Sequence, residues 1–373
     1  MGLLTEAYIK ENVPKLGFGL MRLPKNSDSN SDINIEHFKK MADYYMDNGM
    51  NYFDTAYMYH DGKSEVAFKE AVVKRYPRES YTVADKLPIW EVEKPEDVER
   101  VFNEQLARCG VDYFDYYLLH ALDGEKHEKH EKMGSYEFCM KMKAEGKIKH
   151  FGFSFHGSIE DLKHILATHP EHEFVQLQIN YYDWEFDYRE QYEIVRSYNL
   201  PIIIMEPVRG GFLAKMPADM EKIFKDEEPD MSIASWSIRW VASLDGVMTV
   251  LSGMSTIEQM VDNVSYMKDF QPMTTRENEV VAQVAKALIE APTIPCTDCK
   301  YCIECPIEIP IFDIFGVYND FVNTKSVSEF KKAYAKFEIG ANAAACVECG
   351  LCESICPQNI DIINRLADID ALA

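Results

Sequence analysis

The sequence has 373 residues and is 47% hydrophobic, so it can bury a large core and exceeds the usual size of a single small domain. Its 39 basic and 62 acidic residues give a formal net charge of −23, which opposes binding to nucleic acid or to an anionic membrane surface. No stretch approaches the roughly 20 apolar residues of a spanning helix and the first residues lack a secretory apolar core, so we expect a cytoplasmic protein.

Residues 15–268 alternate short apolar or β-branched runs with amphipathic stretches of helical period, which predicts βα units and a parallel sheet. The strand candidates are eight runs: GFGLMRL, NYFDTAY, SYTVADKL, YFDYYLLH, HFGFSF, FVQLQIN, PIIIMEP and VMTVLSG. Gly49, Gly110 and Gly146 mark predicted helix ends, where a left-handed cap costs least. Eight units over about 250 residues predict a (β/α)8 barrel, and no GxGxxG follows the first strand as in a doubly wound sheet.

Polar side chains follow three successive strands of this predicted barrel. Asp54 and Tyr59 follow the second strand, Lys86 ends the third and His120 ends the fourth. Each has an ordinary structural explanation taken singly, as a turn cap, a packing ring, a solvated charge or a hydrogen-bonded core histidine. Because catalytic residues of such barrels lie at the C-terminal ends of strands, we expect the four to share one site.

The combination suits hydride transfer to a carbonyl group, whose oxygen must gain a proton. A tyrosine with an ordinary pKa of about 10 supplies a proton poorly at neutral pH. A neighbouring Lys86 cation would lower the pKa of Tyr59, and Asp54 would hold that lysine charged and oriented. Tyr59 would then be the acid, and His120 would orient the substrate oxygen.

The segment after His120 reads ALDGEKHEKHEKMG. His127 and His130 in it have a spacing that could hold a metal ion. The interleaved Glu and Lys residues favour a solvated lid or the start of a helix instead.

Eight of the ten cysteines lie between residues 296 and 356, which indicates metal binding rather than disulfides. Cys109 and Cys139 lie apart, in helix-like stretches, and are predicted to be buried inert thiols. The clustered cysteines form two sets, CTDCKYCIECP and CVECGLCESICP, the second with the CxxCxxCxxxCP spacing of bacterial ferredoxins. The first set is one residue shorter before its last cysteine.

In two-cluster ferredoxins the fourth cysteine of each set binds the other cluster. We therefore assign one 4Fe-4S cluster to Cys296, Cys299, Cys302 and Cys356, and a second to Cys346, Cys349, Cys352 and Cys305. Zinc ribbons also use paired CxxC motifs, but they do not require four consecutive cysteines closed by Pro306 or Pro357. We expect residues 1–272 to form the barrel and residues 273–373 a helical connector, an inserted helix near 326–338 and a mainly helical ferredoxin-like domain.

Over residues 13–268 the sequence resembles the aldo-keto reductase family, in LGFGLMRLP, NYFDTAYMYH, VADKLP, YYLLH, GFSF, VQLQINYYD, PVRGGFL and VLSGMSTIEQMVDN. The family's catalytic tetrad falls on Asp54, Tyr59, Lys86 and His120. The resemblance implies reduction of an aldehyde or ketone by NADPH or NADH bound without a Rossmann fold. It places Ser154, Gln176 and Asn180 at the nicotinamide.

Further cofactor contacts are expected in the loops after the first, seventh and last strands, where such barrels bind phosphate through backbone N–H groups. The candidates are Gly19, Met21, Arg22, Pro207, Arg209, Gly210, Gly211, Phe212, Gly253, Ser255, Gln259 and Asn263. Many members of the family have Asn where this chain has Phe155, and Lys and Arg where it has Gly253 and Gln259. The preference between NADPH and NADH therefore stays open.

Iron–sulfur-containing members of the same family resemble the whole arrangement of barrel first and ferredoxin-like module last. Three hypotheses follow. In the first, the barrel reduces a small carbonyl substrate while the clusters exchange electrons with a redox protein partner. In the second, the chain is an electron carrier or adaptor whose barrel only senses the nicotinamide cofactor. In the third, the clusters stabilise the terminal module.

Overall fold

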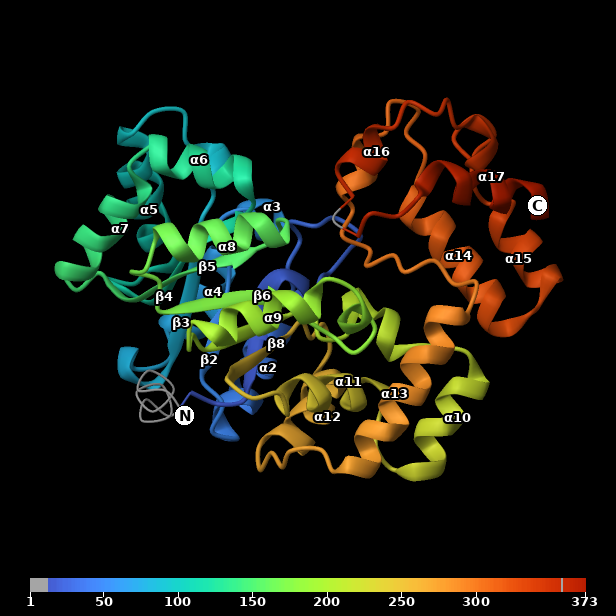
Figure 1. Cartoon of the computed structure of the whole chain (residues 1–373), viewed down its shortest axis with the longest axis horizontal. Helices are drawn as coiled ribbons and strands as arrows, with labels where there is room; N and C mark the ends of the chain where they lie inside the picture. Colours follow the sequence, from blue (N-terminus) through green and yellow to red (C-terminus); the bar gives the residue numbers. More distant parts are fainter. Residues whose placement is uncertain (1–12, 357) are drawn as a thin grey trace. The chain divides into compact units, whose positions relative to one another are not determined.

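In the computed structural model, which describes residues 13–356 and 358–373, eight parallel strands form a closed barrel in sequence order (Figure 1). The strands are β1 (Leu16–Gly19), β2 (Tyr52–Asp54), β3 (Thr82–Leu87), β4 (Phe114–Leu122), β5 (Ile148–Phe155), β6 (Phe174–Gln178), β7 (Ile202–Met205) and β8 (Val247–Ser252). The barrel closes where β1 pairs with β8, with Leu16 opposite Val250. The predicted barrel is confirmed, although the first predicted strand stops at Gly19 and continues as the 3-10 helix η1 (Leu20–Arg22).

Aromatic and aliphatic side chains fill the barrel beneath the C-terminal ends of its strands. Tyr52, Tyr116 and Phe174 form one cluster with residues of β3, β7 and β8, and the ring centroids of Tyr52 and Tyr116 lie 5.3 Å apart. Side chains two residues apart on a strand point to the same face. Tyr52, Ala84 and Leu118 point into the barrel. The residues two positions further along the same strands therefore also point inward, nearer the C-terminal ends of the strands. They are Asp54, Lys86 and His120.

Helices follow the strands around this barrel. They are α2 (Ile35–Asp47), α3 (Tyr59–Gly62), α4 (Ser64–Phe68), η2 (Lys69–Val73), η3 (Arg78–Ser80), η4 (Ile89–Glu91), α5 (Glu96–Cys109), α6 (Gly124–Lys132), α7 (Ser135–Ala144), α8 (Ile159–Thr168), η5 (Asp183–Glu185), α9 (Tyr188–Ser197) and α12 (Ile257–Met267). Gly110 caps α5 with a φ of 72°, as its position in the sequence predicts. Cys109 and Cys139 are both buried, as expected.

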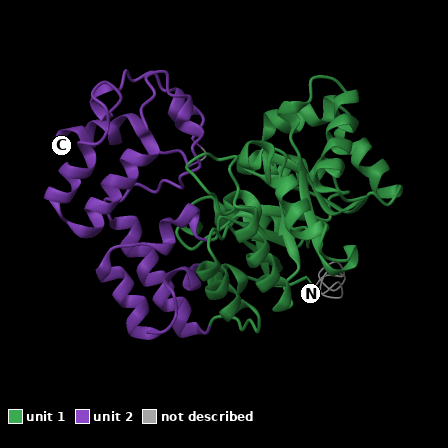
Figure 2. Cartoon of the chain, turned by 180° about the vertical axis from the view of Figure 1, so that it is seen from behind, with its two compact units in different colours: residues 1–207, 238–273 green, residues 208–237, 274–373 purple. Residues whose placement is uncertain are grey.

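The chain divides into two compact units (Figure 2). The first comprises residues 1–207 and 238–273, of which residues 1–12 lie outside the described part, and contains the barrel strands. The second comprises residues 208–237 and 274–373. Residues 208–237, between β7 and β8, thus group with the cysteine-rich segment. The predicted division after residue 272 stays a prediction.

The second unit is helical. Its elements include η6 (Arg209–Ala214), α10 (Ala218–Glu227), the first part of α11 (Ile233–Ala242), α13 (Thr275–Glu290), η7 (Tyr301–Glu304), α14 (Ile311–Thr324), α15 (Val327–Tyr334), η8 (Ala343–Ala345), α16 (Leu351–Ser354) and α17 (Ile362–Leu372). The predicted connector corresponds to α13, which begins with a capping box between Thr274 and Glu277. The predicted inserted helix corresponds to α15, while α14 was not anticipated. Within the described ranges, no helix has the length and apolar character needed to cross a membrane.

Candidate active site and cysteine domain

A buried ion pair lies at the C-terminal end of the barrel. The Lys86 ammonium on β3 donates to Asp54 Oδ1 on β2 at 2.6 Å and to the backbone oxygen of Thr55 at 2.7 Å. The side chains of Lys86 and Asp54 are only 1% and 3% exposed. Two charges removed from water in this way must compensate each other, because each alone would carry a large desolvation penalty.

The other two members of the predicted tetrad lie around this pair. Tyr59 is the first residue of α3, and the Lys86 ammonium lies 5.0 Å from its ring centroid. The His120 ring on β4 meets the Tyr59 ring edge to face, with centroids 6.3 Å apart. The structure therefore brings together the four residues that the sequence places at strand ends.

Burial controls the protonation of these groups. Burial alone would lower the pKa of Lys86, but the charges of Asp54 and Tyr59 outweigh it, so the pKa is raised and the lysine stays charged. Burial raises the pKa of Tyr59 by more than Lys86 lowers it. The net lowering expected for Tyr59 is therefore corrected. Burial, reinforced by the Lys86 charge, holds the pKa of His120 well below its usual value, which keeps the imidazole neutral.

Some of the residues predicted to contact the nicotinamide already hydrogen-bond within the protein, and others have polar atoms without a partner. Ser154 Oγ accepts a hydrogen bond of 2.7 Å from the Ala121 backbone. Among the described residues, Gln176 Oε1 and His120 Nδ1 are buried with no hydrogen-bond partner. Such atoms favour a bound polar group, because an unsatisfied buried acceptor costs free energy.

Asn180, which is also expected at the nicotinamide, has its side-chain amide engaged within the protein. Its Oδ1 accepts from the backbone of Asp183 at 2.8 Å, and its Nδ2 donates to Asp183 Oδ2 at 2.7 Å. Nδ2 also donates to the backbone oxygen of Glu206 at 3.3 Å. Asn180 thus organises the turn that follows β6.

The loop after β8 packs against the end of β1. Ser255 Oγ donates to the backbone oxygen of Arg22 at 2.7 Å, and the Ser255 N–H donates to Gln259 Oε1 at 2.7 Å. A Cβ on Gly253 would lie 3.3 Å from the side chain of Arg22. Met21 is 39% exposed, Gly253 is exposed, and Gly19 precedes η1.

Asn263 on α12, another expected cofactor contact, has its side-chain amide bound to two neighbouring side chains. It donates to Ser252 Oγ at 2.6 Å and accepts from Tyr266 OH at 2.6 Å, and it is buried. Its role is to fix α12 to the end of β8. This use of the amide could not be read from the sequence, because it depends on packing between two elements.

The boundary between the two units follows Pro207, which belongs to the first unit. The other cofactor candidates after β7 belong to the second unit: Arg209, Gly210, Gly211 and Phe212. The Arg209 guanidinium is 4% exposed and donates to the backbone oxygen of Pro295. Gly210 has a φ of 64°, and a Cβ on it would lie 2.0 Å from the Thr297 carbonyl oxygen. The glycine is therefore required for close approach of this loop to the first cysteine set. The expected contact of Arg209 with the cofactor stays a prediction.

The cysteine domain brings the fourth cysteine of the second set to the first set. Cys296, Cys299, Cys302 and Cys356 line one cavity with apolar residues of α14 and α17. Burial, together with these neighbouring cysteines, raises the pKa of Cys302 to about 12. A metal centre here would have to displace thiol protons.

Three of the four cysteines expected at the other cluster also lie near one another. The pKa of Cys352 is raised to about 11, mainly by burial and further by the charges of the nearby Glu353, Cys305 and Cys346. Cys305 and Cys346 also pack against the same apolar cluster as Cys296 and Cys356. Cys305, Cys346 and Cys352 therefore lie near one another, and the assignment of all eight cysteines to two clusters stays a prediction. Pro357 lies outside the described residues.

The loops that join the first three cysteines of each set share one pattern of positive φ values. Positive φ values occur at Asp298 and Lys300 in the first set and at the matching Glu348 and Gly350 in the second. The first set, which lacks one residue, has the 3-10 turn η7 where the second has the α-helical turn α16. The missing residue thus falls between the third and fourth cysteines, after the loops that the two sets share.

Two residues beside the site were missed by the sequence analysis. The ring centroid of Trp90 lies 5.1 Å from that of His120. Gln105 on α5 donates to the backbone oxygen of Lys86 at 2.9 Å and accepts from Tyr117 OH. A buried glutamine on an otherwise apolar helix face was the only available signal.

The barrel and the cysteine-rich segment together define a barrel oxidoreductase joined to an iron–sulfur domain. A model of the aldo/keto reductase family matches residues 15–286, and a model of the 4Fe-4S dicluster domain matches residues 295–360. The chain belongs to the aldo/keto reductase family and carries the dicluster domain after its barrel.

Relatives of known name agree with this assignment. YqkF of Bacillus subtilis strain 168, described as an uncharacterized oxidoreductase, is 23% identical over 286 residues, covering 68% of this chain and 87% of the relative. A protein of Escherichia coli K12 described as an NADH-specific methylglyoxal reductase is 24% identical over 262 residues, covering 58% of this chain and 78% of its own length.

Solved structures show the same fold. The holo form of aldo-keto reductase AKR11C1 from Bacillus halodurans gives a TM-score of 0.59 at 22% identity, covering 74% of this chain and 93% of its own. An aldo-keto reductase from Klebsiella pneumoniae in complex with NADPH gives 0.59 at 22% identity, covering 73% and 91%.

Proposed function

We propose that the protein reduces an aldehyde or ketone with hydride from NADPH or NADH, with Tyr59 as proton donor, and that its terminal domain holds two 4Fe-4S clusters. The observation that supports this most directly is the buried Lys86–Asp54 pair, with Nζ and Oδ1 2.6 Å apart, beside the Tyr59 and His120 rings. A fixed cation beside a phenol stabilises the phenolate that forms when the proton leaves.

Each residue then has a defined task. Tyr59 gives its proton to the carbonyl oxygen, and Lys86 stabilises the resulting negative charge on the phenol. Asp54 keeps the ammonium of Lys86 in place through their hydrogen bond. His120, neutral because burial lowers its pKa, can donate a hydrogen bond to the substrate oxygen without competing as an acid.

The residues around this site fit a nicotinamide cofactor, which supplies the hydride when bound. Ser154 and the unsatisfied Gln176 Oε1 would hold the carboxamide, and the loop at Gly253, Ser255 and Gln259 would hold the phosphate end. The Klebsiella relative was solved with NADPH, and the E. coli relative is described as NADH-specific. Either cofactor is therefore compatible with the proposal.

Two observations support clusters in the cysteine domain. Cys296, Cys299, Cys302 and Cys356 line one cavity, and Cys305 and Cys346 lie near Cys352. We propose that Cys296, Cys299, Cys302 and Cys356 bind one cluster, and that Cys346, Cys349, Cys352 and Cys305 bind the other. Their function would be electron exchange with a redox protein partner. We also propose that the protein acts in the cytoplasm.

The test compares Tyr59→Phe with Tyr57→Phe, a matched control two residues away. The Tyr57 hydroxyl lies 3.3 Å from the Glu104 carboxylate and its ring packs under Arg108, so it belongs to a different contact. Carbonyl-dependent oxidation of NADPH or NADH is measured with a panel of small aldehydes and ketones, including methylglyoxal. Tyr59→Phe should lower the rate by about 100-fold or more, whereas Tyr57→Phe should retain it.

The same experiment addresses the alternative of an electron carrier whose barrel only senses the cofactor. In that case Tyr59→Phe would leave the chain's redox activity unchanged, and NADPH or NADH would act without a carbonyl acceptor. Equal carbonyl reductase rates for wild type and Tyr59→Phe would remove the basis of the proposed acid.

A further inference from the structure

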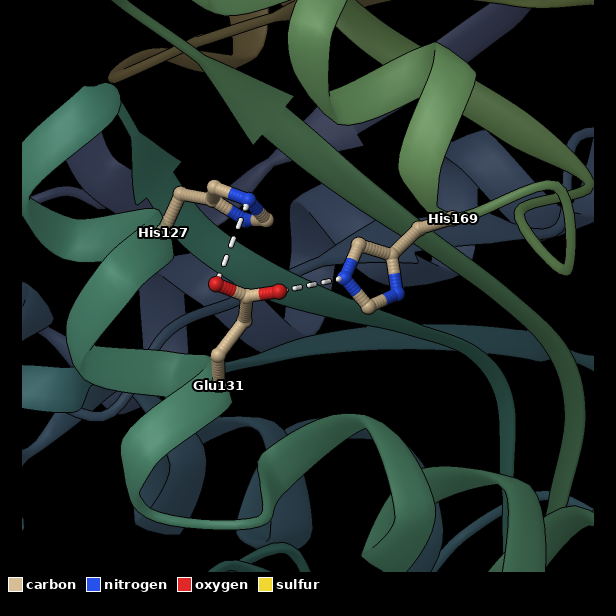
Figure 3. Close-up of side chains that lie close together, drawn as sticks. All are labelled: His127, Glu131 and His169. Carbon is tan, nitrogen blue, oxygen red and sulfur yellow. Dashed lines mark hydrogen bonds and ion pairs between the residues drawn. The ribbon is translucent and has the colours of Figure 1, made fainter.

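A second group of metal-ligating side chains lies on two helices of the barrel unit, α6 and α8. His127 and Glu131 lie one turn apart on α6, and His169 lies at the C-terminal end of α8 (Figure 3). One ligand atom from each of the three residues lies within 4.8 Å of the others. The sequence pairs His127 with His130 instead, but His130 is not part of this set.

The distances suit a small transition-metal ion. Glu131 Oε2 lies 3.8 Å from His127 Nε2, and Glu131 Oε1 lies 3.4 Å from His169 Nε2. Two ligands that each bind tetrahedral zinc at about 2.0–2.1 Å are separated by about 3.3 Å. Small side-chain shifts therefore suffice to close the three ligands on one ion.

The outer ring nitrogen of each histidine is already held by an oxygen atom. His127 Nδ1 hydrogen-bonds to Tyr136 OH at 2.7 Å, and His169 Nδ1 hydrogen-bonds to Glu171 Oε1 at 2.8 Å. When Nδ1 donates to these oxygens, the lone pair of Nε2 is directed toward Glu131. Metal-binding histidines in proteins are generally oriented by such an outer hydrogen bond.

His127 provides an independent indication that a ligand belongs here. Its side chain is 1% exposed, and its Nε2 is buried without a hydrogen-bond partner among the described residues. An unsatisfied buried nitrogen aimed at a carboxylate is costly unless something bridges the two.

We propose that His127, Glu131 and His169 bind one Zn²⁺ ion, with solvent completing its coordination. The site ties α6 to the end of α8, two elements that are otherwise separated by α7 and β5 in the sequence. Glu171 and Tyr136 act as positioning residues that orient the two imidazoles. This site does not depend on the carbonyl reductase activity proposed for the barrel mouth.

The experiment uses the full chain with its clusters intact and one equivalent of Zn²⁺, observed by X-ray absorption at the zinc edge and by competition with a chromophoric chelator. Zinc at this site should show nitrogen and oxygen ligands at about 2.0–2.1 Å, whereas zinc taken up by cysteines would show sulfur at about 2.3 Å. The two spectra thus separate the proposed site from the cysteine domain.

Variants at exposed or half-buried ligands avoid disrupting the core. Glu131→Gln and His169→Asn should each weaken zinc binding more than 10-fold, and Glu171→Gln should weaken it by about 10- to 100-fold. Glu128→Gln, an exposed glutamate on the same helix, should change nothing. A sulfur-dominated spectrum in the wild type, no binding of one equivalent, or equal affinity in Glu131→Gln and Glu128→Gln would overturn the proposal.

Discussion

Replacing Lys86 by methionine should separate the structural role of the Lys86–Asp54 pair from its chemical role. The variant leaves the Asp54 carboxylate 2% exposed with no cation at 2.6 Å, and its Oδ2 has no hydrogen-bond partner among the described residues. Removing one partner of a buried ion pair costs about 3–5 kcal/mol, because the remaining charge is uncompensated. Urea unfolding monitored by tryptophan fluorescence should show a decrease in unfolding free energy of this size.

The double variant Asp54→Asn/Lys86→Met removes both charges and provides the decisive comparison. Its unfolding free energy should return to within about 1–2 kcal/mol of the wild type, since the pair itself contributes little net stability. Carbonyl reduction should nevertheless stay at least about 100-fold below the wild-type rate, because no cation assists Tyr59. A double variant that regains activity with its stability, or a single variant as stable as the wild type, would refute this reasoning.

Three further results are expected. About four irons per chain should remain in Cys305→Ser and in Cys305→Ser/Cys349→Ser, because both cysteines bind the same cluster. The double variant Cys305→Ser/Cys299→Ser should lose both clusters, because it removes one ligand from each. Gly210→Ala should lower the iron content of the purified protein, because its Cβ would lie 2.0 Å from a backbone oxygen beside the first cysteine set. The rate of carbonyl reduction should stay level through about pH 9 and fall only above about pH 10, because burial raises the pKa of the proton donor Tyr59.

Each of these results has a control or a contradictory outcome. Gly211→Ala shares the backbone strain of a positive φ but meets nothing within 4 Å, so it should keep more iron than Gly210→Ala. Equal iron loss in the two Cys305 double variants would contradict the crossed ligation. An alkaline loss of rate centred well below about pH 9 would indicate that Lys86 lowers the pKa of Tyr59 more than burial raises it.

The fold and the four residues at the barrel mouth could be predicted from the sequence because their signals are local. Apolar runs define buried parallel strands, and the strand ends bring Asp54, Lys86 and His120 to one side of the barrel. The cysteine spacing is equally local, since each set forms one repeated loop conformation.

Other features depend on contacts between distant segments and left no trace in the sequence. The engagement of Arg209 with Pro295 joins residues 86 positions apart, and the partners of Asn263 depend on how α12 meets β8. The group formed by His127 and His169 likewise requires α6 and α8 to be packed together. The raised pKa of Tyr59 reflects the desolvation of a half-buried side chain, which residue types alone do not give.

The most direct test of the central proposal follows deuterium from NADPH or NADH labelled at both C4 positions into the reduced carbonyl product. Direct hydride transfer in the barrel predicts one deuterium on the new carbinol carbon in unlabelled water, and Tyr59→Phe should slow its appearance while leaving cofactor affinity unchanged. A product whose carbinol carbon carries only solvent hydrogen would contradict the account, because the electrons would then have reached the substrate without hydride transfer.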